Sequence, residues 1–193
     1  FSWRPDGLAL AYAAADEEPR REGEARHLAT MQVGEQDLFL HAPLRSQHIW
    51  LQAVDTTAAQ RLTSGPWSLE MVLPPGSPPS HLSWSPDGRQ IAFARVPLPQ
   101  SGHFDSVSVG VLDVASRSIR SLNGAERFQN NPRFSPDGRS ILYVCPRDGR
   151  GDLGWQSEIH LAPAAGGPGR SLTRALDRQT FGAEWMPDGK SLL

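Results

Sequence analysis

The chain has 193 residues and a formal net charge of −2, which argues against nucleic acid as its main partner. Its 38% hydrophobic residues, together with 18 glycines and 17 prolines, describe a globular composition that is rich in turns. The longest apolar run, Leu8 to Ala15, is too short to cross a membrane.

The first predicted element is a tight turn between two strands near the amino terminus. It reads Trp3-Arg4-Pro5-Asp6-Gly7, in which proline presets φ, aspartate caps the backbone two residues on, and glycine supplies a positive φ. Leu10 and Tyr12 then fall on one face of the following strand and Ala11 on the other. Apolar residues on both faces predict a strand that is covered on both sides.

The same phrase occurs three more times along the chain. The copies are Trp84 to Gly88, Phe134 to Gly138 and Trp185 to Gly189. The turn glycines are therefore spaced by 81, 50 and 51 residues. A repeat of that length is typical of an array of small β units that pack on one another.

Two further strands are predicted within each unit. The third-strand candidates are Ile49 to Asp55, Val107 to Val114 and Glu158 to Ala162. The fourth strands fall on a second repeated phrase, which is Gln60 to Thr63, Arg120 to Asn123 and Arg170 to Thr173. Four short strands joined by tight turns are the composition of a propeller blade.

The fold class predicted from these units is all-β, a partial β-propeller with three four-stranded blades and the start of a fourth. The expected bounds are about 1–64 for blade one, with an insertion at about 15–47, about 80–123 for blade two, about 130–173 for blade three and about 182–193 for the start of blade four. Because Phe1 and Leu193 both fall inside repeats, we expect a segment of a longer protein. Such a segment, expressed alone, should self-associate through its uncovered blade faces and strand edges.

The insertion is the most charged part of the chain. It opens with Asp16, Glu17 and Glu18, and it could offer carboxylates to a peptide amino terminus or guanidinium groups to a carboxylate. The alternative is a solvated loop whose charges keep it soluble. Within it, Asp37 to Leu40 is short and apolar, so we expect that portion to be ordered.

No pattern in the sequence predicts a catalytic, cofactor-binding or metal-binding residue, and no cofactor is expected. The stretch from Gly149 to Gly154 matches G-x-G-x-x-G by letter but lacks a surrounding βαβ unit, and its embedded Arg-Gly-Asp is attributed to chance. The lone Cys145 is predicted to be a buried strand residue. The histidines show no metal-ligand spacing; they are His27, His41, His48, His81, His103 and His160.

The tryptophans divide into two groups. Those that repeat with the turn are predicted to be core residues, namely Trp3, Trp84 and Trp185. Those outside that register are candidates for loop or interface contacts, namely Trp50, Trp67 and Trp155. Among these, Trp67 in a proline-containing link is the one that could line a cleft.

The complete repeat resembles the propeller repeats of two protein groups. It runs from Trp84-Ser85-Pro86-Asp87-Gly88-Arg89 through Ile91-Ala92-Phe93 to a third strand ending in aspartate, and then to a phrase that reads Arg-x-Leu-Thr at Arg170 to Thr173. One group is the prolyl oligopeptidase family of serine peptidases, in particular its bacterial acylaminoacyl-peptidase-like members, and the other is TolB. Residues 62–69, the insertion and residues 164–178 favour the peptidases, which the chain resembles along essentially its whole length.

The peptidase resemblance implies a propeller beside an α/β-hydrolase domain, whose serine, aspartate and histidine would lie outside this chain. It implies a non-catalytic segment that screens peptide substrates and shapes the cleft, so the implied partners are that hydrolase domain and a peptide, with a homo-oligomer as a further partner. No nucleic acid and no membrane is expected. The alternative is a TolB-like protein-interaction module, and the residues favour neither a cytoplasmic nor a periplasmic or secreted location.

Overall fold

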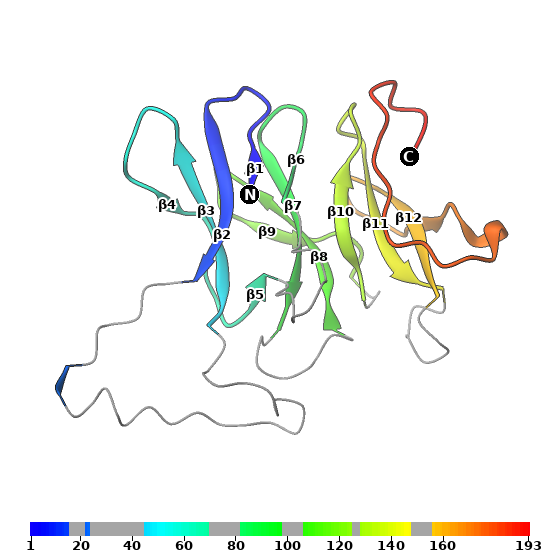
Figure 1. The fold of residues 1–193 in the computed structure, drawn as a ribbon, viewed down its shortest axis with the longest axis horizontal. Coiled ribbons are helices and arrows are strands. Elements are labelled where there is room, and N and C mark those ends of the chain that lie inside the picture. Colours follow the sequence, from blue (N-terminus) through cyan, green and yellow to red (C-terminus); the bar gives the residue numbers. More distant parts are fainter. Residues whose placement is uncertain (16–21, 24–44, 70–81, 98–105, 125–127, 148–155) are drawn as a thin grey trace.

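The computed structural model describes residues 1–15, 22–23, 45–69, 82–97, 106–124, 128–147 and 156–193. Within them lie three antiparallel sheets, arranged side by side in chain order (Figure 1). The predicted insertion at about 15–47, the stretch from Gly149 to Gly154 and Trp155 fall wholly or largely outside the described residues, as does Asp37 to Leu40.

The strands follow the predicted order closely. The first sheet contains β1 (Ser2–Trp3), β2 (Ala9–Ala15), β3 (Gln47–Ala53) and β4 (Gln60–Arg61). The second contains β5 (Ser68–Leu69), β6 (Ser83–Trp84), β7 (Gln90–Val96), β8 (Ser108–Asp113) and β9 (Ile119–Ser121). The third contains β10 (Asn130–Phe134), β11 (Ser140–Pro146), β12 (Ser157–Pro163) and β13 (Arg170–Ser171). The 3-10 turn η3 (Arg174–Leu176) and a bridge between Trp185 and Leu192 follow.

The second sheet has five strands where the sequence predicted four. Both β5 and β6 pair with the same edge of β7, since Ser68 lies opposite Val96 and Trp84 lies opposite Ile91. The long link before the second turn phrase therefore separates two short segments that share one strand position. As a result, the second sheet also takes residues that precede the expected start of blade two at about residue 80.

The four turn phrases have the conformation that their residues predict. All four turn glycines have a positive φ, between 63° and 71°. In the second and third copies the serine hydroxyl donates to the aspartate carboxylate at 2.6 Å, as Ser85 to Asp87 and Ser135 to Asp137. The same carboxylates accept the backbone N–H two residues on, which closes each turn.

The sheets are held together by their apolar faces. Ile91 and Phe93 of β7 pack on Ala11 and Ile49 of the first sheet, while Ala92 on the other face of β7 packs toward the third sheet. The prediction that this strand is covered on both sides is confirmed, because each of its residues from 91 to 94 is fully buried.

The outer face of the first sheet corrects two expectations. Trp3, predicted to be core, is 54% exposed, and Leu10 and Tyr12 are only half-buried. No described sheet packs against that face, so these residues lack the cover that Trp84 receives. Trp84 is 7% exposed, and its Nε1 donates to the carbonyl of Ser2 at 3.2 Å.

The sheets have two distinct ends. One end carries the four Pro-Asp-Gly turns, which lie along the top of Figure 1. At the other end, the chain passes from β2 to β3, from β7 to β8 and from β11 to β12. Ala15 lies opposite Gln47 there in the first sheet, and Pro146 lies opposite Ser157 in the third. We call these the turn end and the connection end. No helix in the described part of the chain has the length and apolar character needed to cross a bilayer.

Candidate functional site

The connection end is built on a hydrogen bond that recurs in the first and third sheets. The hydroxyl of Thr63 accepts the backbone N–H of Ile49 at 2.9 Å, and that of Thr173 accepts the N–H of Ile159 at 3.0 Å. Each threonine ends a copy of the second repeated phrase, Gln60 to Thr63 or Arg170 to Thr173. The bond fixes the start of the third strand and so positions the side chains beside it.

In the second sheet an asparagine replaces that threonine. Here Gln129 accepts the N–H of Val109 at 3.2 Å, in the place of the threonine hydroxyl. The Gln129 amide then donates to Asn123 at 2.7 Å, and Asn123 donates to the Tyr143 hydroxyl at 2.9 Å. This polar chain joins the second sheet to the third.

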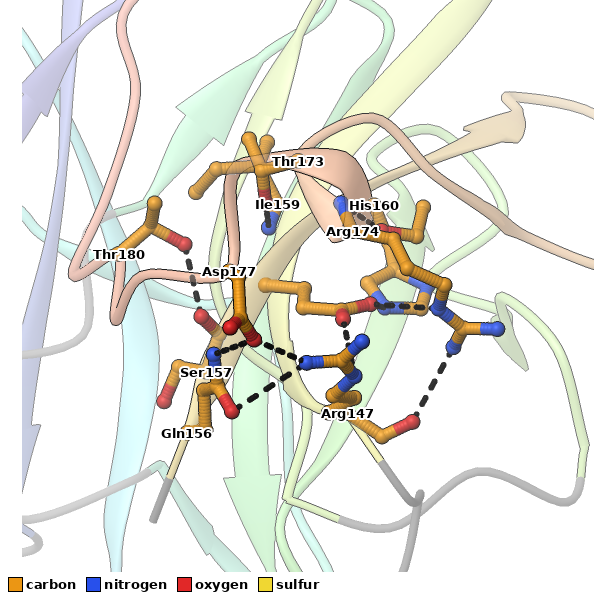
Figure 2. A network of polar contacts seen from close by, with 11 residues as sticks. Arg147, Gln156, Ser157, Ile159, His160, Thr173, Arg174, Asp177 and Thr180 are labelled. Carbon is orange, nitrogen blue, oxygen red and sulfur yellow. Dashed lines mark hydrogen bonds and ion pairs between the residues drawn. The ribbon is translucent and has the colours of Figure 1, made fainter.

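A cluster of four charged side chains lies at the connection end of the third sheet (Figure 2). Glu158 of β12 is only 2% exposed, and its two oxygens face Arg147 and Arg174, each 3.4 Å from the guanidinium Nε. Arg147 also reaches Asp177 at 2.7 Å. We call these four residues the ion cluster.

The ion cluster is held in place by the chain that follows β13. Arg174 opens η3, and its guanidinium donates to the carbonyl of Arg147 at 3.2 Å. Asp177 caps η3 in the left-handed conformation with φ 47°. The hydrogen bond from Arg147 holds the pKa of Asp177 below its ordinary value. With two cations and two carboxylates, the ion cluster balances its own charge.

A second cluster lies between the first and second sheets, at the same end. Trp67 directly precedes β5 in the chain and is half-buried. Its ring stacks on Phe93 with centroids 5.6 Å apart, and it makes an edge contact with the His48 ring at a centroid distance of 5.0 Å. Gly65 is required there because a Cβ would lie 2.8 Å from Trp67 Nε1, and its φ of 132° disfavours other residues.

Arg95 differs from the arginines of the ion cluster. It stands two residues after Phe93 on the same face of β7, with its guanidinium carbon 6.0 Å from the centre of the Trp67 ring. Burial lowers the pKa of Arg95 from its ordinary value, and no charged partner contributes to that shift. Among the described residues no carboxylate forms an ion pair with it. We call Trp67 and Arg95 the aromatic–arginine pair.

The predicted candidates have different outcomes. Trp67 makes the interface contacts expected of it, whereas Trp50 lies half-buried within β3. Cys145 is buried in β11, as predicted. His48 and His160 lie in different sheets, and the other four histidines fall outside the described residues. No group of side chains able to hold a metal ion occurs in the described part of the chain.

Sequence reasoning missed both the ion cluster and Arg95. The signal for Arg95 was weak: at the corresponding position after the turn glycine the other units carry Ala14 and Cys145, so an arginine departs from the repeat. The signal for Glu158 was a carboxylate at the start of a predicted buried strand.

Comparison with curated proteins finds peptidases. An uncharacterised peptidase, YuxL, of Bacillus subtilis is 24% identical over 113 residues, which is 57% of this chain and 16% of that protein. Dipeptidyl-peptidase 5 of Porphyromonas gingivalis is 29% identical over 130 residues, which is 64% of this chain and 18% of that protein. The chain thus spans less than a fifth of the length of these relatives. No protein-family model matches the sequence.

Comparison with solved structures finds β-propellers. TolB of Acinetobacter baumannii superposes with a TM-score of 0.57 at 18% identity, covering 98% of this chain and 35% of that one. The β-propeller domain of the Trilobed protease from Pyrococcus furiosus gives 0.52 at 14% identity, covering 94% of this chain and 43% of that one. The expected all-β propeller fold and the resemblance to peptidase and TolB propellers are therefore confirmed.

Proposed function

We propose that this chain is three blades and the start of a fourth from the propeller of a serine peptidase of the prolyl oligopeptidase type. In this proposal the propeller is non-catalytic: it screens peptides and shapes the cleft beside an α/β-hydrolase domain encoded in the same reading frame. The observation that carries the proposal is the sequence relation to peptidases, which extends over 57% and 64% of the chain.

The geometry supports a division of labour between the two ends of the sheets. The turn end repeats one short hairpin four times with the same φ values, so it offers little that distinguishes one blade from the next. The connection end differs from sheet to sheet, since it carries Trp67 between the first and second sheets, Gln129 in the second and the ion cluster in the third. Recognition depends on such differences, so we assign peptide screening to the connection end.

The test is to express the complete reading frame and treat it with a fluorophosphonate that reacts with activated serines. We expect one labelled serine outside residues 1–193, identified by mass spectrometry of the labelled peptide. We also expect hydrolysis of short peptides and none of a folded protein that contains the same sequence. An unlabelled protein that hydrolyses no peptide would overturn the peptidase proposal.

A second candidate function rests on the fit to TolB, which covers 98% of this chain. In that case the propeller is a protein-interaction module with no hydrolase domain. The two candidates differ in one direct observation, because a reading frame that closes after further blades, with no serine that reacts, supports the module.

A further inference from the structure

We infer that the aromatic–arginine pair, Arg95 on Trp67, is a binding site for a peptide carboxylate. The inference rests on the proposed function for the assumption that the connection end faces peptides. It goes beyond that function by naming the group that is recognised and the residue that recognises it.

The first step of the argument is charge balance. An arginine remains protonated at neutral pH, so its guanidinium either pairs with an anion or stays in contact with water. Arg147 and Arg174 pair with Glu158 within the fold. Arg95 is half-buried, yet no described carboxylate pairs with it, and among the described residues its guanidinium lies over the Trp67 ring.

The second step is rigidity. Trp67 is fixed by the Phe93 ring, by the edge of His48 and by the close approach of Gly65. An aromatic ring held on three sides supports the guanidinium in one place, and this lowers the entropy lost when a ligand binds. The planar fork of an arginine matches a carboxylate through two parallel hydrogen bonds.

The third step is location. Arg95 is paired with Leu69 of β5 and with Ser108 of β8, at the point where β7 reaches the connection end. It therefore lies at the end where the sheets differ from one another. A peptide that approaches the connection end would meet this cation.

The carboxylate could be the carboxyl terminus of a peptide or an acidic side chain, and both present the same planar anion. The experiment uses the complete reading frame and three fluorescent pentapeptides that differ only in this respect. One has a free carboxyl terminus, one has a carboxyl-terminal amide, and one has the amide with an internal glutamate. Affinity is measured by fluorescence anisotropy at low salt, with the hydrolase serine blocked if the fluorophosphonate reacts.

We expect the free acid or the glutamate peptide to bind at least tenfold more tightly than the plain amide. Arg95→Gln should abolish that preference, and Arg95→Lys should retain part of it because the charge remains while the fork is lost. The matched control is Arg139→Gln at the turn end, an arginine that should leave all three affinities unchanged. Thermal melting of each variant establishes that it is folded.

The outcomes separate this inference from the proposed function. Equal binding of the three peptides, or a preference that survives in a folded Arg95→Gln variant, would overturn the carboxylate site. A protein that reacts with the fluorophosphonate and cleaves peptides but shows such equal binding keeps the proposed function and loses this inference. A protein that does not react, yet prefers the carboxylate through Arg95, keeps the site and loses the peptidase.

Discussion

The two charged regions of the connection end differ in how their arginines are partnered. Arg147 and Arg174 enclose Glu158, whose side chain is 2% exposed, whereas Arg95 rests on an aromatic ring without a described carboxylate. Arg95 and Cys145 occupy corresponding positions in their strands, and Ser108 lies opposite one as Glu158 lies opposite the other. The two sheets differ at both positions of this strand pair, and Arg147 and Arg174 of the ion cluster correspond to Pro97 and Gly124 in the second unit.

This difference indicates which region serves stability and which serves binding. A cluster that balances its own charge offers little to a ligand, and its removal should loosen the fold. A cation that is only partly solvated and has no carboxylate partner among the described residues contributes little to folding and retains its capacity for an anion. The predictions that follow either sharpen that contrast or remove it.

The largest effect is expected in the ion cluster. Glu158→Gln leaves two guanidinium groups around an uncharged buried amide. We expect the local stability to fall by about 3 kcal/mol. This is the low end for a broken buried pair, because both arginines reach water. Hydrogen exchange of the peptides covering β11 and β12 measures it as a local opening free energy.

The control is Glu184→Gln, which breaks an ion pair with Arg133 at 2.9 Å whose carboxylate is 62% exposed. That pair should contribute less than about 1 kcal/mol. Arg95→Gln should likewise change the opening free energy of β7 by less than about 0.5 kcal/mol. A loss at Arg95 that equals the loss at Glu158 would remove the distinction between the two regions.

The next effect is expected beneath the aromatic–arginine pair. Gly65→Ala places a Cβ 2.8 Å from Trp67 Nε1 at a φ of 132°, and we expect about 2 kcal/mol of destabilisation from overpacking and backbone strain. Because the tryptophan must shift, the preference for a carboxylate should fall as well. Gly124→Ala is the control, since a Cβ there meets nothing within 4 Å. Chemical denaturation and the anisotropy assay check the two parts, and an unchanged preference would show that Trp67 does not position Arg95.

Repetition determined how much of the fold could be predicted. The turn phrase recurs four times, and the phrase that ends in Thr63 or Thr173 makes the same bond in the first and third sheets, so the strand order, the buried faces of β7 and the burial of Cys145 followed from the sequence. The division of the first strand position into β5 and β6 did not, because it occurs once and a two-residue strand has no pattern of its own.

The site depends on departures from the repeat, and these are difficult to interpret in a single sequence. Glu158 and Arg95 each interrupt an apolar strand, yet only the three-dimensional pairing shows that one has two arginines beside it and the other has a tryptophan. Trp3 was mispredicted for a different reason. It follows the repeat and has the residue pattern of a core strand, but no described sheet covers its face, so it is exposed.

A smaller effect should distinguish the two copies of the strand-capping bond. Thr63→Val and Thr173→Val each remove a hydroxyl that accepts a strand N–H, at a typical cost of about 1 kcal/mol. The cost should be greater at Thr63, which is 4% exposed, because the N–H of Ile49 then finds no water, whereas Thr173 is only half-buried. Exchange rates of the Ile49 and Ile159 amides report each bond directly, and the reverse order would mean that solvent reaches the first sheet more readily.

The smallest effect concerns the turn end, where the second and third sheets should behave alike. The hydrogen bond from Ser85 lowers the pKa of Asp87, and the one from Ser135 lowers the pKa of Asp137. A carboxyl whose pKa is lower when folded stabilises the fold above its unfolded pKa, near 3.8, and that contribution is lost as the pH falls through the folded value. Asp87→Asn and Asp137→Asn should therefore each reduce the fall in melting temperature between pH 7 and pH 3 by the same small amount. Unequal changes would mean that the two sheets differ at the turn end as well, and the contrast between them could then no longer be assigned to Arg95 and Glu158 alone.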